Sequence, residues 1–126
     1  MKISDGEAMG WLRAAVGVAL IAAPAVPMRL SGREEPTNAG LLLMRTIGIR
    51  DLVLGLGTVA AARSPEVQDF RRWNSVTLAS DSLDAIVSVA SSGSIGKRDA
   101  WSAAGLALAF VCGDLRAGRR GTARPE

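Results

Sequence analysis

The stretch Arg45-Thr-Ile-Gly-Ile-Arg-Asp-Leu-Val-Leu-Gly55 decides the fold, because it places three charges inside an otherwise apolar run from residue 40 to residue 62. Within a bilayer, a charged side chain at the centre of a helix costs about 3 kcal/mol or more unless it is paired or hydrated. Such side chains therefore turn toward a partner, a cavity or a lipid headgroup. The run predicts a membrane-spanning helix whose charged side faces the interior of a bundle.

Four apolar segments, of which this run is the second, alternate with polar breaks along the chain. They predict four helices and a basic flexible tail, at about residues 9–30, 40–62, 65–92 and 99–116, and at 117–126. Pro24 and Pro27 end or kink the first helix, because proline lacks an amide donor and collides with the preceding turn. The chain of 126 residues is long enough for one domain. We expect an all-α fold, an antiparallel up-down four-helix transmembrane bundle.

The composition favours lipid over water as the surrounding medium. Apolar residues make up 48% of the chain, but they are mostly small, with two Phe, three Trp and no Tyr. Helices in lipid associate through the close approach of small residues. Small residues recur at four-residue spacing in two places and could form smooth stripes for such contacts, or could only reflect the abundance of Ala and Gly. The two sets are Ala15, Ala19 and Ala23, and Gly105, Ala109 and Gly113. The rival architecture is a soluble antiparallel four-helix bundle, which the uniformly apolar flanks of residues 40–62 disfavour.

The lack of histidine and the single Cys112 exclude several kinds of chemistry. The usual zinc, haem and iron–sulfur ligand sets need His or further Cys, and Ser-His-Asp and Cys-His catalysis need His. We therefore predict no catalytic residues, no metal and no cofactor, and we favour a non-enzymatic role. The opening Met-Lys-Ile-Ser-Asp-Gly-Glu is too acidic for the basic leader of a cleavable secretory signal.

Basic residues at the segment ends predict the orientation, because cytoplasmic loops are enriched in Lys and Arg. Both termini and the loop after the second segment together hold eight: Lys2, Arg63, Arg71, Arg72, Arg116, Arg119, Arg120 and Arg124. The opposite side holds four: Arg29, Arg33, Lys97 and Arg98. We expect a multi-pass protein of the inner (plasma) membrane with both termini in the cytoplasm. The net charge of +3 does not indicate nucleic acid.

Polar residues share one face of the second and third helices. On a helical wheel the second helix has a small and polar arc of Gly48, Asp51, Gly55 and Thr58, with Arg50 about 100° away. The third helix has a polar face of Trp73, Thr77, Ser80, Asp84, Ser88 and Ser91, with Asp81 at its edge. Its other face is apolar: Val76, Leu83, Ile86, Val87 and Ala90. The polar side of this amphipathic helix should face something other than lipid.

These charges define a candidate intramembrane polar cluster of six residues: Arg13, Arg45, Arg50, Asp51, Asp81 and Asp84. One interpretation is a structural pairing network that fixes the register of the helices, with Asp84 as its central carboxylate. Others are an anionic headgroup held by Arg45 and Arg50, a proton relay through the two aspartates of the third helix, or a hard cation held by carboxylates. Buried ion pairs must be well satisfied to persist.

Several motifs carry a resemblance to a known group. They are Ala23-Pro24, the stretch from Arg45 to Gly55 as Arg-x-x-Gly-x-Arg-Asp-x-x-x-Gly, Arg71-Arg72-Trp73, and Asp81-x-x-Asp84. The chain resembles an uncharacterised family of small four-helix membrane proteins, mostly from actinobacteria, whose domain has no known function. It is also distantly similar to DoxX-type four-helix membrane proteins, some of which are accessory subunits of quinone-linked oxidoreductases. The resemblance implies the architecture and supplies no activity.

The functional expectation is an accessory or scaffold subunit of a membrane complex or homo-oligomer, with membrane lipids and either itself or other membrane subunits as partners. The alternative is a small transporter or a lipid- or anion-binding membrane protein that uses the Arg/Asp cluster. A bound partner protein would favour the first. A stoichiometric small molecule beside Arg45 and Arg50 would favour the second.

Overall fold

The computed structural model describes residues 3–30, 35–90 and 97–121, and these residues form helices without any strand. The helices are, in chain order, α1 (Asp5–Ala22), α2 (Ala25–Leu30), α3 (Asn38–Arg63), α4 (Val67–Ala90) and α6 (Lys97–Gly121). The all-α class predicted from the sequence is confirmed.

The first apolar segment forms two helices instead of one helix over residues 9–30. Ser4 caps α1, its hydroxyl accepting the Glu7 amide at 3.2 Å, so that the helix starts several residues earlier than expected. Helix α1 ends at Ala22, just before Pro24, which supplies no amide to continue the hydrogen-bond ladder. The short α2 then begins at Ala25.

The last helix is longer than the sequence predicts, because α6 continues through residues 117–121, where a flexible tail is expected. Ala117 is only 3% exposed, and a Cβ added at Gly118 would lie 3.1 Å from the Asn74 amide nitrogen of α4. Tertiary packing against α4 thus extends the helix past a glycine that would otherwise favour its end.

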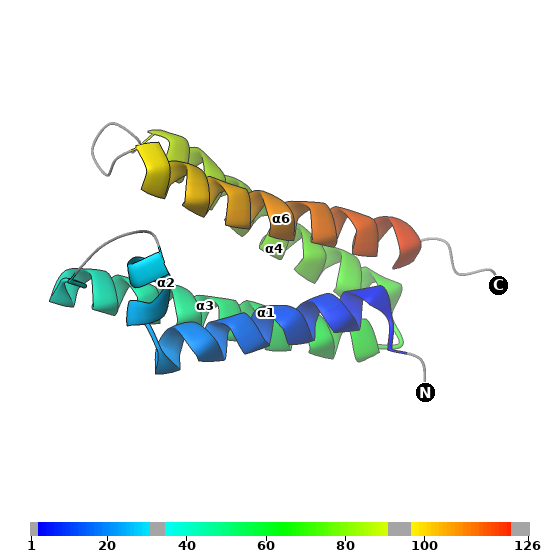
Figure 1. Cartoon of the computed structure of the whole chain (residues 1–126). Coiled ribbons are helices and arrows are strands. Elements are labelled where there is room, and N and C mark those ends of the chain that lie inside the picture. Colours follow the sequence, from blue (N-terminus) through cyan, green and yellow to red (C-terminus); the bar gives the residue numbers. More distant parts are fainter. Residues whose placement is uncertain (1–2, 31–34, 91–96, 122–126) are drawn as a thin grey trace.

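The long helices form two close pairs. Helix α1 packs along α3 and α4 packs along α6, while the two pairs share fewer contacts with each other (Figure 1). The start of α1, the turn between α3 and α4, and the end of α6 lie at one end of the molecule (Figure 1). At this end the Arg63 guanidinium of α3 is 2.6 Å from the Glu7 carboxylate of α1.

Glycines bring α1 and α3 into backbone contact. A Cβ added at Gly17 would lie 2.6 Å from the carbonyl oxygen of Gly48, and one added at Gly55 would lie 2.6 Å from that of Gly10. Real Cβ atoms essentially never approach other atoms this closely, so the axes can be this near only where glycine removes the side chain.

The small-residue stripes expected from sequence spacing do not make this contact. Ala15, Ala19 and Ala23 are exposed, as are Gly105 and Ala109, and nothing lies within 4 Å of a Cβ added at Gly105. Gly113, the last member of the second stripe, does lie against α1, where an added Cβ would overlap the Met9 side chain. The α1–α3 contact instead uses the buried glycines of these two helices.

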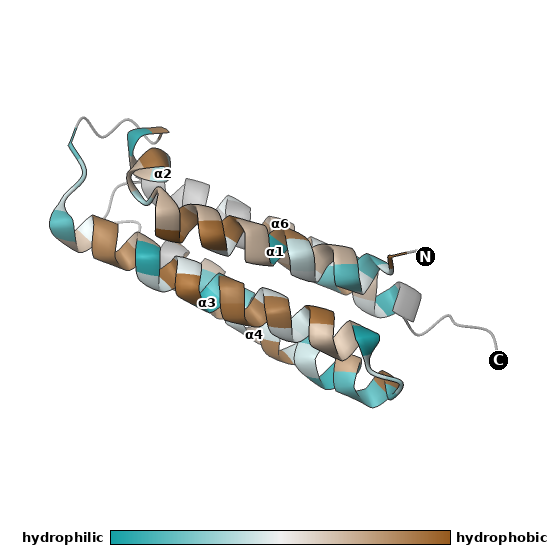
Figure 2. Ribbon diagram, turned by 90° about the horizontal axis from the view of Figure 1, so that it is seen from below, coloured by the Kyte–Doolittle hydropathy of each residue, from teal (hydrophilic) through white to brown (hydrophobic). Residues whose placement is uncertain are grey.

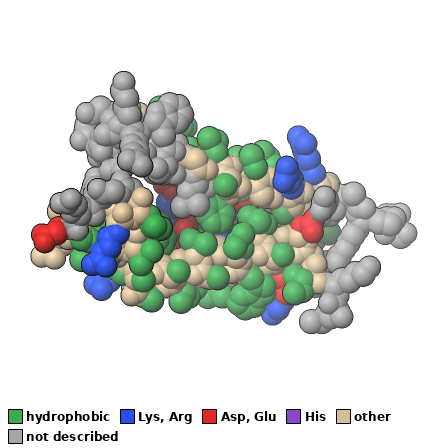
Figure 3. Space-filling model, in the orientation of Figure 1, with side chains coloured by type: hydrophobic (Ala, Val, Ile, Leu, Met, Phe, Trp, Pro, Cys, Tyr) green, Lys and Arg blue, Asp and Glu red, His purple; other side chains and the backbone are tan. Residues whose placement is uncertain are grey.

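The described residues have an inverted distribution of polarity. Six polar or charged side chains are buried: Arg13, Asp51, Thr58, Thr77, Asp81 and Asp114. Large apolar side chains are exposed along the long helices, including Leu42, Leu43, Ile49, Val53, Val76, Leu83, Ile86 and Val87. Figure 2 shows apolar bands on the outward side of α1 and α3, and Figure 3 shows hydrophobic side chains over the middle of one face. Within the described residues, no helix combines the length and the hydropathy needed to cross a membrane.

Candidate functional site

The centre of the site is Arg13 of α1, which is 2% exposed and faces carboxylates from three other helices. Its Nη2 donates to Asp81 Oδ2 of α4. Its Nε lies 4.0 Å from Asp51 Oδ1 of α3, and its Nη1 lies 3.9 Å from Asp114 Oδ2 of α6. One guanidinium therefore connects all four long helices.

The sequence of α1 directs Arg13 inward. Gly10, Arg13, Ala14 and Gly17 are buried, and their spacing of three, one and three residues follows one face of a helix. The glycines let α3 approach this face, and the guanidinium lies 4.6 Å from the centre of the Phe110 ring of α6. An aromatic face attracts a cation at this distance, most strongly where water is excluded.

Arg50 of α3 forms the outer part of the same site. Its Nη2 lies 3.4 Å from Asp51 Oδ1, and its Nη1 pairs with Asp84 Oδ2 of α4. The Arg50 and Asp84 side chains are 35% and 39% exposed, whereas those of Arg13, Asp51, Asp81 and Asp114 are at most 6% exposed. We call these residues the Arg13 network: Arg13, Arg50, Asp51, Asp81, Asp84 and Asp114.

Polar side chains around the network join the helices further. Trp73 Nε1 of α4 donates to the Leu54 carbonyl of α3 at 3.1 Å, and Asn74 Nδ2 donates to the Asp114 carbonyl of α6 at 3.3 Å. The hydroxyl of Thr77, which is fully buried, donates to the Asn74 carbonyl at 2.9 Å. Among the side chains that the structure describes, five buried polar atoms have no hydrogen-bond partner: Arg13 Nε and Nη1, Arg50 Nε, Asn74 Oδ1 and Asp114 Oδ2.

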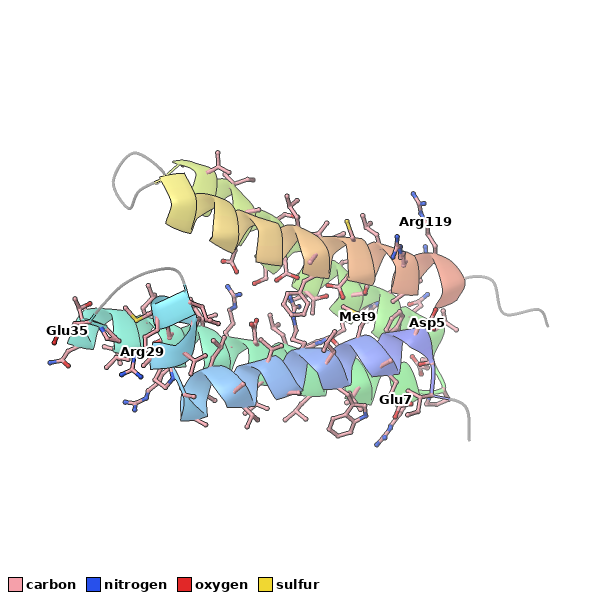
Figure 4. The ribbon with its side chains drawn as sticks, viewed as in Figure 1. Asp5, Glu7, Met9, Arg29, Glu35 and Arg119 are labelled. Carbon is pink, nitrogen blue, oxygen red and sulfur yellow. The ribbon has the colours of Figure 1, made fainter. Side chains whose placement is uncertain are left out.

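Several charged residues outside the network lie toward the two ends of the molecule. Figure 4 shows Asp5, Glu7 and Arg119 near the end where α1 begins, and Arg29 and Glu35 near the opposite end. The interior charges of the network are thus separated from these end groups along the length of the helices.

Of the six residues predicted for the polar cluster, the structure brings five together and leaves one outside. Arg45 is exposed, and the ion pairs found among the described residues do not include it. The roles within the cluster also differ from the prediction. Arg13 is its centre, and Asp81 is the buried carboxylate, whereas Asp84 lies at the partly exposed edge. Ser91 lies outside the described residues, and the side chain of Ser88 is likewise not described.

Sequence reasoning missed Asp114. It lies within an apolar run of the fourth segment, between Cys112-Gly113 and Leu115, where an acid needs a partner for the same reason as Asp51 does. The sequence does show an acid inside an apolar run, but Asp114 lies near the end of the predicted helix, where a charged residue is ordinary. Phe110, one turn earlier on the same helix, was missed too, since an aromatic in an apolar run carries no distinct signal.

The described part of the chain holds no group of three or more His, Cys, Asp or Glu side chains placed to bind a metal ion. A surface hollow lies at the end where α1 begins, among residues that include Gly6, Ala61, Phe70 and Ala117. Members of the Arg13 network do not line it. The network is therefore a packed set of ion pairs and not the wall of this hollow.

Comparison of the chain with known protein families, with curated proteins and with solved structures finds no match. The Arg13 network and the outer surface are therefore the features that bear on the function of this protein. The family likeness carried by the sequence motifs stays a prediction.

The two aspartates of α4 should respond differently to the same substitution. We expect Asp81→Asn to lower the free energy of unfolding by about 1.5–3 kcal/mol, the range for a hydrogen bond to a charged group. Asp84→Asn should lower it by at most about 1 kcal/mol, because solvent competes for a partly exposed pair. Thermal unfolding of both variants in one mild detergent measures the difference. Equal effects, or a larger effect at Asp84, would contradict the burial order.

Proposed function

We propose that this protein is a non-enzymatic integral membrane protein, an antiparallel up-down four-helix bundle that acts as an accessory or scaffold subunit. Its partners are membrane lipids and either further copies of itself or other membrane subunits. The Arg13 network holds the four long helices in register, and the outer surface meets lipid and partner helices.

The inverted distribution of polarity carries this proposal. In water, extended exposed apolar surface is unfavourable, and so are charges buried in the interior. In a bilayer the outer surface of a bundle is apolar, and ionisable residues face its interior and pair with one another. Leu83, Ile86 and Val87 of α4 are each more than 60% exposed, while Asp81 on the same helix is 2% exposed.

The charges of α3 are compatible with this setting. Asp51 and Arg50 lower the mean hydropathy of the helix, but both are members of the network and are paired there. Arg45 lies about two turns from the start of α3 at Asn38, where a long side chain can extend toward the headgroups. Each charge of the helix thus has a partner or a route to polar surroundings.

A scaffold role fits the network better than anion binding does. The network has four carboxylates and two guanidiniums, so its net charge opposes an anionic headgroup or substrate. Its members connect α1, α3, α4 and α6, which is what a register-fixing device requires. The resemblance to small four-helix membrane proteins supports the same assignment.

The orientation we propose has both termini in the cytoplasm of a cell whose plasma membrane holds the bundle. The end at which α1 begins and α6 finishes also carries Arg63 and the start of α4, with Arg71 and Arg72 (Figure 1). Arg29 lies near the opposite end (Figure 4). The larger basic cluster is expected on the cytoplasmic side.

One preparation tests both parts of this proposal. The protein should sediment with membranes, resist extraction by alkaline carbonate and be released by mild detergent, because its apolar surface remains in lipid. Native mass spectrometry of the released material should then give a homo-oligomer or a complex with another membrane protein.

Recovery as a monomer in carbonate without detergent would reject the membrane assignment. A monomer that carries a small molecule at one copy per chain would reject the scaffold role. A reporter fused after Glu126 checks the orientation separately, and activity confined to the outside of the cell would reverse it.

A further inference from the structure

The Arg13 network is unbalanced in charge when all of its groups are ionised. Four carboxylates and two guanidiniums leave an excess of two negative charges. Asp84 is partly exposed and can be solvated, but Asp51, Asp81 and Asp114 are all buried. Buried charge without compensation is strongly unfavourable, so a group of this kind takes up a counter-ion or a proton.

Asp114 is the carboxylate with the weakest compensation. Asp81 accepts a hydrogen bond from Arg13, and Asp51 lies near both Arg13 and Arg50. Asp114 Oδ2, by contrast, has no hydrogen-bond donor, and its nearest cationic atom, Arg13 Nη1, is 3.9 Å away. The Asp114 side chain is 5% exposed, which leaves little access for water.

We propose that Asp114 is a proton-binding site in the interior of the bundle, occupied at neutral pH. The charged groups that face it are Arg13 of α1, Asp81 of α4 and, across Arg13, Asp51 of α3. The bound proton removes one of the two excess charges. Release of the proton would place a third negative charge beside Arg13, so occupancy is coupled to the packing of α6 against α1 and α4.

This inference does not rest on the scaffold role or on the membrane, because it uses only groups inside the bundle. The test is infrared spectroscopy of the full chain at pH 7 in an alkyl maltoside, a detergent without ester carbonyls. The wild type should show the carbonyl stretch of a protonated carboxylic acid, which an ionised carboxylate lacks. Asp114→Asn should lose this band, and the control Asp84→Asn should keep it.

A second measurement avoids dependence on the folding of a variant. Wild-type protein labelled with carbon-13 at the aspartate carboxyl should show the band at lower frequency, because the heavier carbon slows the vibration. A band that does not move, or no band at all at pH 7, would overturn the proposal. Persistence of the full band in folded Asp114→Asn would also overturn it, by assigning the proton to another aspartate.

Discussion

Arg13→Met is expected to lower the free energy of unfolding by about 3–5 kcal/mol, the range for breaking a buried ion pair by removing one partner. Methionine is unbranched and fills much of the same volume, so the loss is mainly one of charge. Asp81 would lose its hydrogen-bond donor, and Asp114 its nearest cation. Because small proteins are stable by only about 5–15 kcal/mol in total, this change should leave much of the population unfolded at moderate temperature. Thermal unfolding and proteolysis in mild detergent measure it.

The matched control is Arg45→Met, the same substitution at an exposed arginine of α3. It should leave the melting temperature within error of the wild type, as surface substitutions usually do. The double variant Arg13→Met, Asp81→Leu should recover part of the loss, because the carboxylate closest to Arg13 is then no longer left unpaired. If Arg13→Met were as stable as Arg45→Met, the guanidinium would not be holding the helices together.

The faces of single helices could be predicted from the sequence. The predicted arc of α3, with Gly48, Asp51, Gly55 and Thr58, is buried at all four positions. On α4 the predicted apolar side is exposed at Val76, and Thr77, on the predicted polar side, is fully buried. Helical periodicity fixes these directions from spacing alone, so no knowledge of the neighbouring helices is needed.

The depth of each side chain could not be predicted in the same way. Asp81 and Asp84 lie one turn apart and both fall on the polar side of α4, but Asp81 is buried and Asp84 is partly exposed. Which of them reaches the interior depends on where α3 and α6 pack against α4, and a helical wheel does not contain that information. For the same reason the central role of Arg13 could not be predicted, because its three carboxylate neighbours come from three different helices.

The residues through which the helices touch could not be predicted from the sequence pattern either. The Ala stripe of α1 has the regular spacing that favours close packing, but its members are exposed, and Gly10 and Gly17 meet α3 instead. Spacing shows that a smooth face exists, whereas the crossing point of the two axes decides which positions must lack a Cβ. In a chain with 14 glycines, abundance alone does not single out these two.

The second large effect is expected from Gly17→Leu at that crossing. A Cβ at this position would lie 2.5 Å from the Leu52 amide nitrogen and 2.6 Å from the Gly48 carbonyl oxygen. Both are backbone atoms of α3, so no side-chain rotation can relieve the overlap. The loss should exceed the about 1–3 kcal/mol of ordinary overpacking, since α1 and α3 must separate along their length. We expect little folded protein by size-exclusion chromatography in detergent.

Gly105→Leu is the matched control, because α6 leaves open space around a Cβ at that position. Leucine favours a helix more than glycine does, so this variant should match the wild type or exceed it in stability by up to about 1 kcal/mol. The same substitution at two helical glycines should thus have effects of opposite sign, and only the α1–α3 contact distinguishes them. If Gly17→Leu folded as well as Gly105→Leu, α1 and α3 could not be in backbone contact at Gly17. The close α1–α3 packing could then not be what places Arg13 in the network.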